Sequence, residues 1–289
     1  KILERRKVMR LLSFVRNGDV GFGLEKDKGI VNLTDIMDGV WTIKRALELD
    51  LLESIKDVAK DRGPDFSWTD VTPLPVIPDP GKIICVGLNY ANHVAETKRP
   101  DSKYPTIFTR FADSQIGHNG IIYKPEASNA LDYEGEMAII IGKGGRKITK
   151  KAAMSHIAGY ACYNDATVRD WQRHTSQFTP GKNYPSTGGF GPFMVTTDEV
   201  GDYKKLNIQT RLNGNVMQDA KLSQLIFPIP DLINYISSFS PLSPGDVIVS
   251  GTPGGVGDRR EPPVYMKDGD LIEVEITKLG ILKNRVLAE

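Results

Sequence analysis

"LDYEGEMAIIIG", residues 131–142, places three carboxylates within five residues, directly before a run of apolar side chains. In a strand, side chains two residues apart project to the same face, so Asp132, Glu134 and Glu136 are predicted to point one way, with Gly135 opposite. Such close carboxylates repel one another. A bound cation, basic side chains or uptake of a proton must balance their charge. An acidic triplet taken alone is also typical of a solvated strand end.

A second stretch, "YACYNDATVRDWQR" at residues 160–173, places Asp165 at the end of another apolar strand. Its carboxylate is a candidate third ligand for a hard cation such as Mg²⁺, which prefers oxygen ligands and keeps positions open for water or substrate. The sequence has no His-x-x-His and no Cys-x-x-Cys pair, which disfavours a zinc site of the common kind.

A third stretch, "GLNYANHVAET" at residues 87–97, holds His93 and Glu96. If this stretch is helical, the two side chains share one face, where the carboxylate can orient the imidazole and raise its basicity. That arrangement suits a general base. The alternative is an ordinary pair of polar residues on a solvated helix.

The bulk composition is that of an ordinary globular protein. The chain has 289 residues, 40% of them hydrophobic, and its 37 basic and 36 acidic side chains give a net charge of +1, which argues against a polyanion-binding surface over the whole molecule. Cys85 and Cys162 lie among apolar or aromatic residues and are predicted to be buried thiols in a reducing compartment, without a disulfide. No apolar run reaches the roughly 20 residues of a membrane span.

The first residues lack a signal-peptide core and cleavage site, so we expect a cytoplasmic protein, and residues 1–8 are interpreted as a remnant or a trimmed extension. Strand patterns and a helix predicted over residues 42–61 indicate a small N-terminal α+β domain. Four prolines in "TPLPVIPDPGK" favour an extended linker. We therefore predict a small domain at residues 1–75 and a catalytic domain at 76–289. The fold class is α+β and β-rich, and the Asn-Gly pair within residues 206–220 predicts a hairpin.

Six motifs in order resemble the fumarylacetoacetate hydrolase family over residues 80–287. They are "KIICVGLNYANHVAE", "DYEGEMAIIIG", "YACYNDATVRDWQ", "TPGKNYPSTGGFGP", "PGDVIVSGTPGGVG" and "DGDLIEVEITKLGILKNRV". The nearest branch is that of small acylpyruvases and 2-hydroxyhepta-2,4-diene-1,7-dioate isomerases. The resemblance implies a mixed β-roll, barrel-like catalytic domain in which Glu134, Glu136 and Asp165 hold one Mg²⁺ or Mn²⁺, with Ca²⁺ a further candidate in crystals.

The same residue-by-residue resemblance implies the remaining roles. His93 and Glu96 look like a dyad that activates water on a segment that orders as a lid, and Asp132 is interpreted as a supporting residue beside the ligands. The expected residues around the substrate are Lys182 and Gln172, which support the oxyanion, together with Arg169, Thr252 and Tyr184, which bind substrate.

Several of these residues also have purely structural interpretations. Arg169 can pair with Asp170 or with a cluster acid, and Thr252 can be no more than a turn former. Tyr184 lies where this chain departs from the family pattern: many relatives carry an aromatic residue and an Asp directly after "GK", whereas this chain has Asn183, Tyr184 and Pro185. Arg110 and Ser114 are either substrate contacts or part of a surface loop.

The leading functional hypothesis is a hydrolase that cleaves the C–C bond of an acylpyruvate, such as fumarylpyruvate from aromatic catabolism, to pyruvate and a carboxylic acid. A divalent metal on the pyruvoyl oxygen stabilises the enolate that this reaction needs. The alternatives are an isomerase of a 2-hydroxymuconate-type dicarboxylate, an oxaloacetate decarboxylase, and a non-catalytic 2-oxo acid binder.

Two other mechanisms are disfavoured. A glycosidase is disfavoured because Glu134 and Glu136 lie side by side instead of facing each other across a bond. A serine hydrolase is disfavoured because G-x-S-x-G is missing. We expect a small 2-oxo or 2,4-dioxo acid substrate, no nucleic-acid or membrane partner, and a homodimer, with the apolar segment at residues 225–233 a candidate contact.

Overall fold

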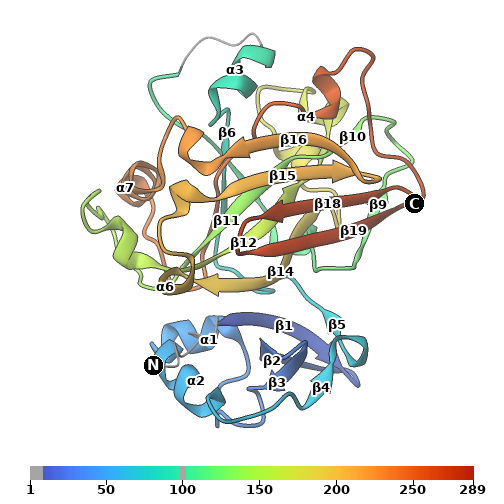
Figure 1. The fold of residues 1–289 in the computed structure, drawn as a ribbon. Helices are drawn as coiled ribbons and strands as arrows, with labels where there is room; N and C mark the ends of the chain where they lie inside the picture. The colour runs from blue at the N-terminus through green and yellow to red at the C-terminus, as the bar shows by residue number, and fades with distance from the viewer. Residues whose placement is uncertain (1–8, 98–101) are drawn as a thin grey trace.

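The computed structural model describes residues 9–97 and 102–289. Two sheets pack face to face in the main body, and a smaller N-terminal unit lies at one end (Figure 1). The predicted α+β, β-rich class is confirmed. Within the described ranges, no helix is both long and apolar enough to cross a membrane.

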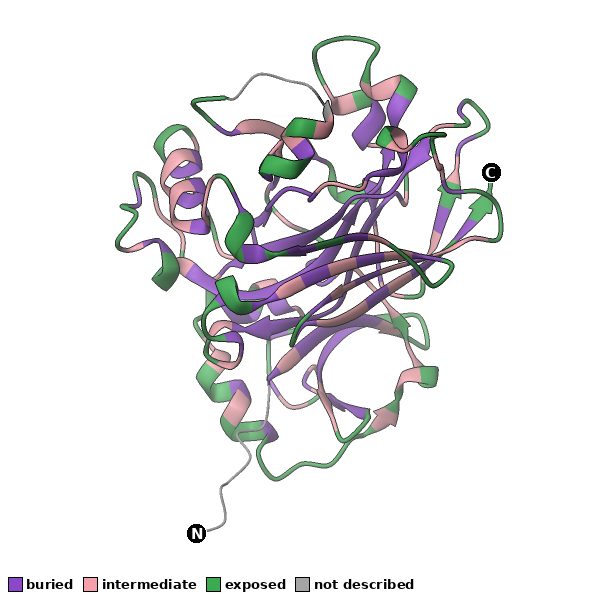
Figure 2. Cartoon of the chain, turned by 45° about the horizontal axis from the view of Figure 1, so that its top comes forward, coloured by how far each residue is buried: buried purple, intermediate pink, exposed green. Residues whose placement is uncertain are grey.

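Within the described residues, the larger sheet has twelve strands. Its main path runs β4 (Phe66–Ser67), β3 (Gly29–Asn32), β2 (Asp19–Lys26), β1 (Arg10–Arg16), β14 (Gly188–Thr196), β12 (Ile157–Asp165), β11 (Gly135–Ile141), β17 (Val247–Val249), β6 (Ile83–Gly87) and β7 (Thr106–Arg110). Beside this path, β5 (Thr72–Pro73) pairs with β1, and β8 (Gln115–Ile116) pairs with β14. Every residue of β11, β12 and β14 is buried, as expected for strands covered on both faces (Figure 2).

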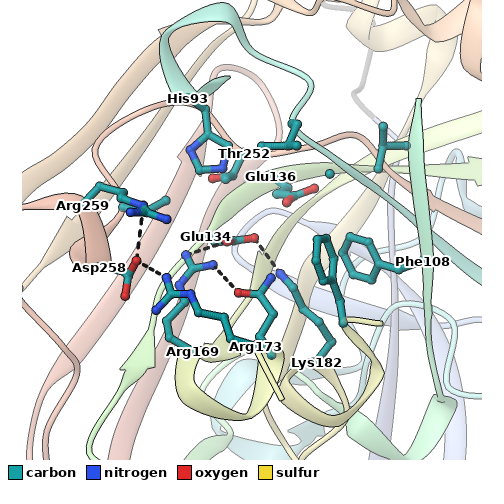
Figure 3. Close-up of a pocket in the computed structure, with 16 residues that line it drawn as sticks. His93, Phe108, Glu134, Glu136, Arg169, Arg173, Lys182, Thr252, Asp258 and Arg259 are labelled. Atoms are coloured by element: carbon teal, nitrogen blue, oxygen red, sulfur yellow. Dashed lines mark hydrogen bonds and ion pairs between the residues drawn. The ribbon is translucent and has the colours of Figure 1, made fainter. Parts of the chain in front are cut away.

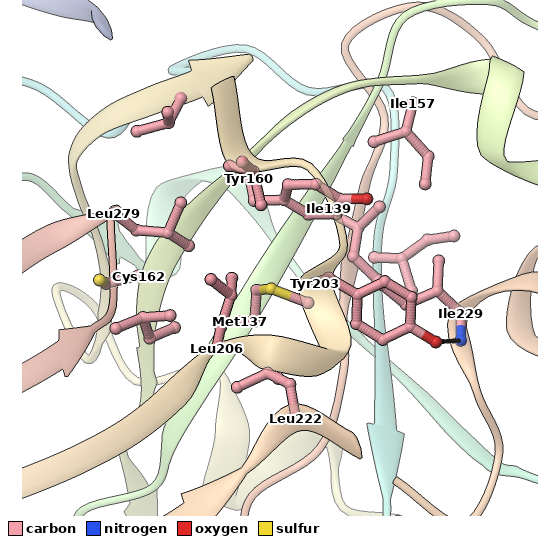
Figure 4. Close-up of a cluster of buried hydrophobic side chains, with 14 of the residues drawn as sticks. Met137, Ile139, Ile157, Tyr160, Cys162, Tyr203, Leu206, Leu222, Ile229 and Leu279 are labelled. Atoms are coloured by element: carbon pink, nitrogen blue, oxygen red, sulfur yellow. Dashed lines mark hydrogen bonds between the residues drawn. The ribbon is translucent and has the colours of Figure 1, made fainter. Parts of the chain in front are cut away.

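The second sheet has five strands, in the order β16 (Asn215–Lys221), β15 (Asn207–Leu212), β18 (Leu271–Ile276), β19 (Gly280–Ala288) and β9 (Ile121–Lys124). Its inner face and that of the large sheet enclose a core that includes Met137, Ile139, Tyr160 and Cys162 (Figure 4). Burial of each such apolar side chain contributes about 1.5–3 kcal/mol. The predicted hairpin is confirmed, because β15 and β16 join at Asn213 and Gly214, both with positive φ.

The helices are short and lie outside the sheets (Figure 1). They are α1 (Ile43–Glu48), α2 (Leu52–Ala59), α3 (Ala91–Thr97), α4 (Arg169–Gln172), α5 (Thr179–Lys182), α6 (Thr197–Val200) and α7 (Ile229–Phe239). The prediction of one helix over residues 42–61 was wrong, because α1 and α2 are separate. Asp50 takes φ of 55°, a left-handed conformation that Asp tolerates, and the Leu51 N–H donates back to the Ala46 carbonyl at 2.9 Å. The Asp50 conformation and the Leu51 hydrogen bond end α1. The apolar spacing continues into α2 because both helices cover the same core.

The N-terminal unit joins the main body through the large sheet. Strand β1 pairs with β2 on one side, and on the other side Arg10 and Leu11 lie opposite Val195 and Met194 of β14. The predicted boundary at residues 75/76 therefore separates two parts of one continuous sheet.

Two further expectations concern single segments. Cys85 and Cys162 are buried free thiols, as predicted. In the segment at residues 225–233, Leu225, Ile229 and Leu232 lie in the chain's own core, whereas Ile226 is exposed. The homodimer, with this segment as its contact, stays a prediction.

Gly135 marks a close approach between the two sheets and gives a test of the packing. A methyl group added there would meet Thr210 Oγ1 of β15 at 2.0 Å. We expect Gly135→Ala to lower the free energy of unfolding by about 1–3 kcal/mol in urea titrations, since a tight core does not accept the extra volume. Gly63→Ala is the matched control, because an added methyl group meets nothing there, and it should change the value by less than about 1 kcal/mol. Equal effects of the two variants would contradict this packing.

Candidate active site and metal centre

A cavity opens where α3, α4 and α5 surround the ends of β11 and β12 (Figure 3). Its volume is about 50 Å³. The polar side chains that line it come from five separate parts of the chain: His93, Glu134, Glu136, Arg169, Gln172, Arg173, Lys182, Thr252, Asp258 and Arg259. Phe108 and Phe178 contribute an aromatic wall.

The acidic stretch that opens the sequence is not one continuous strand. Asp132 belongs to β10 (Leu131–Asp132), which pairs with β13 (Thr167–Val168) in a small separate sheet, and β11 starts only at Gly135. At the break, the Glu134 N–H donates to Asn164 Oδ1 at 3.1 Å and the Asp165 N–H donates to the Glu134 carbonyl at 2.8 Å. The break brings Glu134 beside Asp165 and sends Asp132 elsewhere, so the predicted common face for all three acids was wrong for Asp132.

Glu134, Glu136 and Asp165 form one buried group, as the sequence predicted. Each offers a carboxylate oxygen, and these atoms lie within 4.8 Å of one another. Lys182 donates to Glu134 Oε2 at 2.7 Å and to Asp165 Oδ2 at 2.6 Å. Arg110 donates to Asp165 Oδ1 at 2.6 Å. Two of the three carboxylates are therefore held by buried cations.

Glu136 is the exception. It accepts a hydrogen bond from the Gly251 N–H at 2.5 Å, and among the described residues no basic side chain forms an ion pair with it. Burial, together with the charges of Asp165 and Glu134, raises the pKa of Glu136. Burial also acts against ionisation of Glu134, but the charges of Lys182 and Arg169 outweigh it and lower that pKa.

If all its groups are ionised, the buried cluster carries one more negative than positive charge. Four carboxylates lie with three cationic side chains: Asp132, Glu134, Glu136 and Asp165 with Arg110, Arg169 and Lys182. A divalent cation fits this donor set, because carboxylate oxygens suit Mg²⁺ and Mn²⁺ and each oxygen keeps a lone pair beside its present hydrogen bond.

His93 is held from one side. Its Nδ1 lies 3.3 Å from Glu96 Oε2, and Glu96 Oε1 accepts a hydrogen bond from the Gly255 N–H. Asn92 Oδ1 accepts from the Gly254 N–H at 3.1 Å. Helix α3 is thereby attached to the loop after β17. The imidazole lines the cavity, while Glu96 orients it from outside the lining.

Asp132 supports the site from behind. Its carboxylate accepts bonds from Arg169 Nε at 2.8 Å and from the N–H groups of Gly257 and Asp258 at 2.8 and 3.0 Å. Arg169 also contacts Glu134 Oε1 at 2.6 Å. The supporting role predicted for Asp132 agrees with this geometry. Arg169 forms ion pairs with Asp132 and Glu134, in agreement with its structural interpretation.

The other predicted substrate contacts divide into two groups. Gln172, Lys182 and Thr252 line the cavity. The Thr252 hydroxyl is already engaged, since it donates to the Gly135 carbonyl at 3.0 Å and accepts from Gln218 Nε2 at 2.7 Å. Tyr184 is not among the described residues of the lining. Its ring packs edge-on against Trp171, 5.4 Å between centroids, which turns it away from the cavity.

Some residues of the site were missed or misplaced by the sequence analysis. Arg110 is neither a surface-loop residue nor part of the lining, because it is buried and holds Asp165 and Thr187. Arg173, Asp258 and Arg259 line the cavity without having been proposed. Arg173 could have been predicted from its spacing, because it lies one helical turn after Arg169. Asp258 and Arg259 could not, because "GDRR" at residues 257–260 is typical of a polar turn.

The family profile described as fumarylacetoacetate (FAA) hydrolase C-terminal matches residues 82–287. The chain belongs to the fumarylacetoacetate hydrolase family. Oxaloacetate tautomerase FAHD2B, mitochondrial, from Homo sapiens is 41% identical over 226 residues, 78% of this chain and 72% of the relative. Oxaloacetate tautomerase fahd2, mitochondrial, from Xenopus laevis is 39% identical over 238 residues, 82% of this chain and 75% of the relative.

Solved structures agree with the family assignment over nearly the whole chain. A putative HpcE protein from Mycobacterium smegmatis superposes with a TM-score of 0.87 at 30% identity, covering 97% of this chain and 99% of the other. Maleylpyruvate hydrolase from Sphingobium sp. SYK-6 has a TM-score of 0.82 at 26% identity, covering 97% of this chain and 100% of the other. The family fold thus accommodates proteins named for different reactions.

The unequal charge environments of the two glutamates give a test in metal-free protein. Glu134→Gln removes one of the two acidic partners of both Lys182 and Arg169, so we expect the free energy of unfolding to fall by about 3–5 kcal/mol. Glu136→Gln removes a carboxylate without a cationic partner and should change it by less than about 1 kcal/mol. Urea titration after chelator treatment measures both, with exposed Glu126→Gln as the control.

Metal addition separates the same variants in another way. Mg²⁺ or Mn²⁺ at a hundredfold excess over its Kd should stabilise the unsubstituted protein by about 2.7 kcal/mol and raise its Tm. The Glu136→Gln variant should lose most of that rise. An undiminished rise in this variant would exclude Glu136 as a ligand.

Proposed function

We propose that this protein is a metal-dependent enzyme that interconverts the keto and enol forms of a small 2-oxo acid. The observation that supports this most directly is the shared cavity, where the cluster of Glu134, Glu136 and Asp165 lies near the His93 imidazole. Glu96 orients that imidazole. From the sequence alone, hydrolysis was the leading hypothesis. The tautomerase names of the relatives at 39–42% identity favour the isomerising alternative.

The residues of the site have separable tasks in this reaction. A divalent cation held by Glu134, Glu136 and Asp165 supplies Lewis-acid stabilisation of negative charge on the 2-oxo oxygen. His93 Nδ1 faces Glu96, so Nε2 is the atom left to take a proton from the carbon next to the carbonyl. The enolate oxygen then takes up a proton from water, and His93 Nε2 returns its proton to water, so the substrate keeps its number of protons and the imidazole is regenerated.

Lys182 contributes charge rather than proton transfer. Burial disfavours its cationic form, but the charges of Asp165 and Glu134 outweigh this effect and raise the pKa of Lys182. The ammonium therefore stays charged at neutral pH, next to the oxygen on which negative charge develops. The Glu96 carboxylate stabilises the imidazolium that His93 becomes after accepting the proton.

Hydrolysis of an acylpyruvate is the second candidate. The His93–Glu96 pair favours it, because an oriented imidazole can deprotonate water as well as carbon. The structural similarity to a protein named maleylpyruvate hydrolase supports the same reaction on this fold.

Enol decay tests the proposed reaction. Oxaloacetate is added as the enol, and its absorbance is followed with metal-stripped protein, with and without Mg²⁺. We expect acceleration only with metal, and a loss of about 100-fold or more in kcat for His93→Gln, since a general base contributes about 10²–10⁴. His156→Gln, outside the cavity, is the matched control.

The competing reactions are measured in the same samples. Pyruvate released from acetylpyruvate, with no acceleration of enol decay, would replace the tautomerase by the hydrolase. Metal-dependent pyruvate from oxaloacetate itself would indicate a decarboxylase.

A further inference from the structure

One side of the cavity carries two arginines that the proposed reaction does not use. Arg173 follows α4, and Arg259 ends the short 3₁₀ turn Gly257–Arg259. Both line the cavity, on the side opposite Phe108 (Figure 3). Their side chains are 47% and 37% exposed, so a ligand in the cavity can reach them.

In the part of the chain that the structure describes, a single carboxylate pairs with both arginines. Asp258 Oδ2 accepts from Arg173 Nη2 and lies 3.4 Å from Arg259 Nε. Burial opposes ionisation of Asp258, but hydrogen bonds from Arg173 and Tyr265 outweigh it and lower the pKa of the carboxyl. One anion thus serves two guanidinium groups. Each guanidinium has five N–H donors, so most of them are left for a further acceptor.

Asp258 cannot move freely to follow a ligand. Its other oxygen accepts from the Tyr265 hydroxyl at 2.9 Å, and its N–H donates to Asp132 at 3.0 Å. Asp132 in turn holds Arg169, which contacts the metal-ligating Glu134. Asp258 is therefore connected to Glu134 through Asp132 and Arg169. This chain of contacts sets the spacing between the arginine side of the cavity and the cluster of metal-binding acids.

We infer that Arg173 and Arg259 form a subsite for the far carboxylate of the substrate, with Asp258 as their positioning residue, and that the substrate is a 2-oxo dicarboxylic acid. This inference rests on the proposed function for the other end of the cavity. The excess positive charge and the planar guanidinium groups suit a carboxylate, which arginine binds through paired hydrogen bonds.

Paired substrates test the subsite. Enol oxaloacetate and its monomethyl ester at the far carboxyl differ in one charge, and we expect kcat/KM to favour the diacid by about ten- to a hundredfold. In Arg173→Gln and Arg259→Gln this preference should fall, mainly through KM of the diacid, because the far carboxylate does not react. The ester should be affected little. Arg146→Gln, an exposed arginine outside the cavity, is the control.

Binding of unreactive analogues separates the inference from the proposed function. Malate and lactate differ in the same far carboxylate and are titrated calorimetrically into Mg²⁺-loaded protein, with melting curves to confirm that each variant folds. A malate preference that both arginine variants lose supports the subsite even if no enol is turned over, in which case only the proposed function fails. Turnover without any diacid preference, or equal losses for malate and lactate, would overturn the subsite and leave the proposed function intact.

Discussion

The burial of four carboxyl groups with three cationic side chains at the ends of β11 and β12 is the constraint on which the rest of the site depends. Charged groups leave water only when partners replace the lost hydration. Arg110, Arg169 and Lys182 do so for three acids, and each of these bases comes from a different part of the chain. Glu136 is left to a backbone N–H alone. Glu136 is therefore the acid beside which a bound cation can add positive charge, and the ion pairs of Glu134 and Asp165 keep the neighbouring carboxylates in position.

The same acids also organise the loops around the cavity. Asp132 accepts the N–H groups that begin the turn bearing Asp258 and Arg259, while Glu96 and Asn92 attach α3 to the neighbouring Gly254–Gly255 segment. Within residues 132–136, Asp132 thus supports the loops, while Glu134 and Glu136 belong to the cluster that could bind a metal. Loops attached by such hydrogen bonds have fewer conformations open to them than loops without them, which suits a site that must present groups at defined positions.

Much of this arrangement could be predicted from the sequence, and the failures have physical causes. The apolar strands, the Asn-Gly hairpin and the group of Glu134, Glu136 and Asp165 follow from local patterns together with the resemblance to a family. The separation of α1 from α2 could not be found from apolar spacing, because both helices cover one core and the break depends on the backbone conformation of Asp50. Tyr184 packs on Trp171 and Arg110 holds Asp165, and neither arrangement could be predicted, because tertiary contacts decide what a side chain faces. Arg173 and Arg259 become neighbours only through Asp258, 85 residues along the chain from Arg173.

Strand β14 depends on segments distant in sequence to complete its pairing. On the side away from β12, its first residues pair with β8, and near its other end Met194 and Val195 pair with β1 of the N-terminal unit. Without these partners, a fully buried apolar strand would present unpaired N–H and C=O groups, the kind of open edge that recruits other chains into aggregates. The small N-terminal unit thus covers part of a strand edge that the catalytic body alone would leave open.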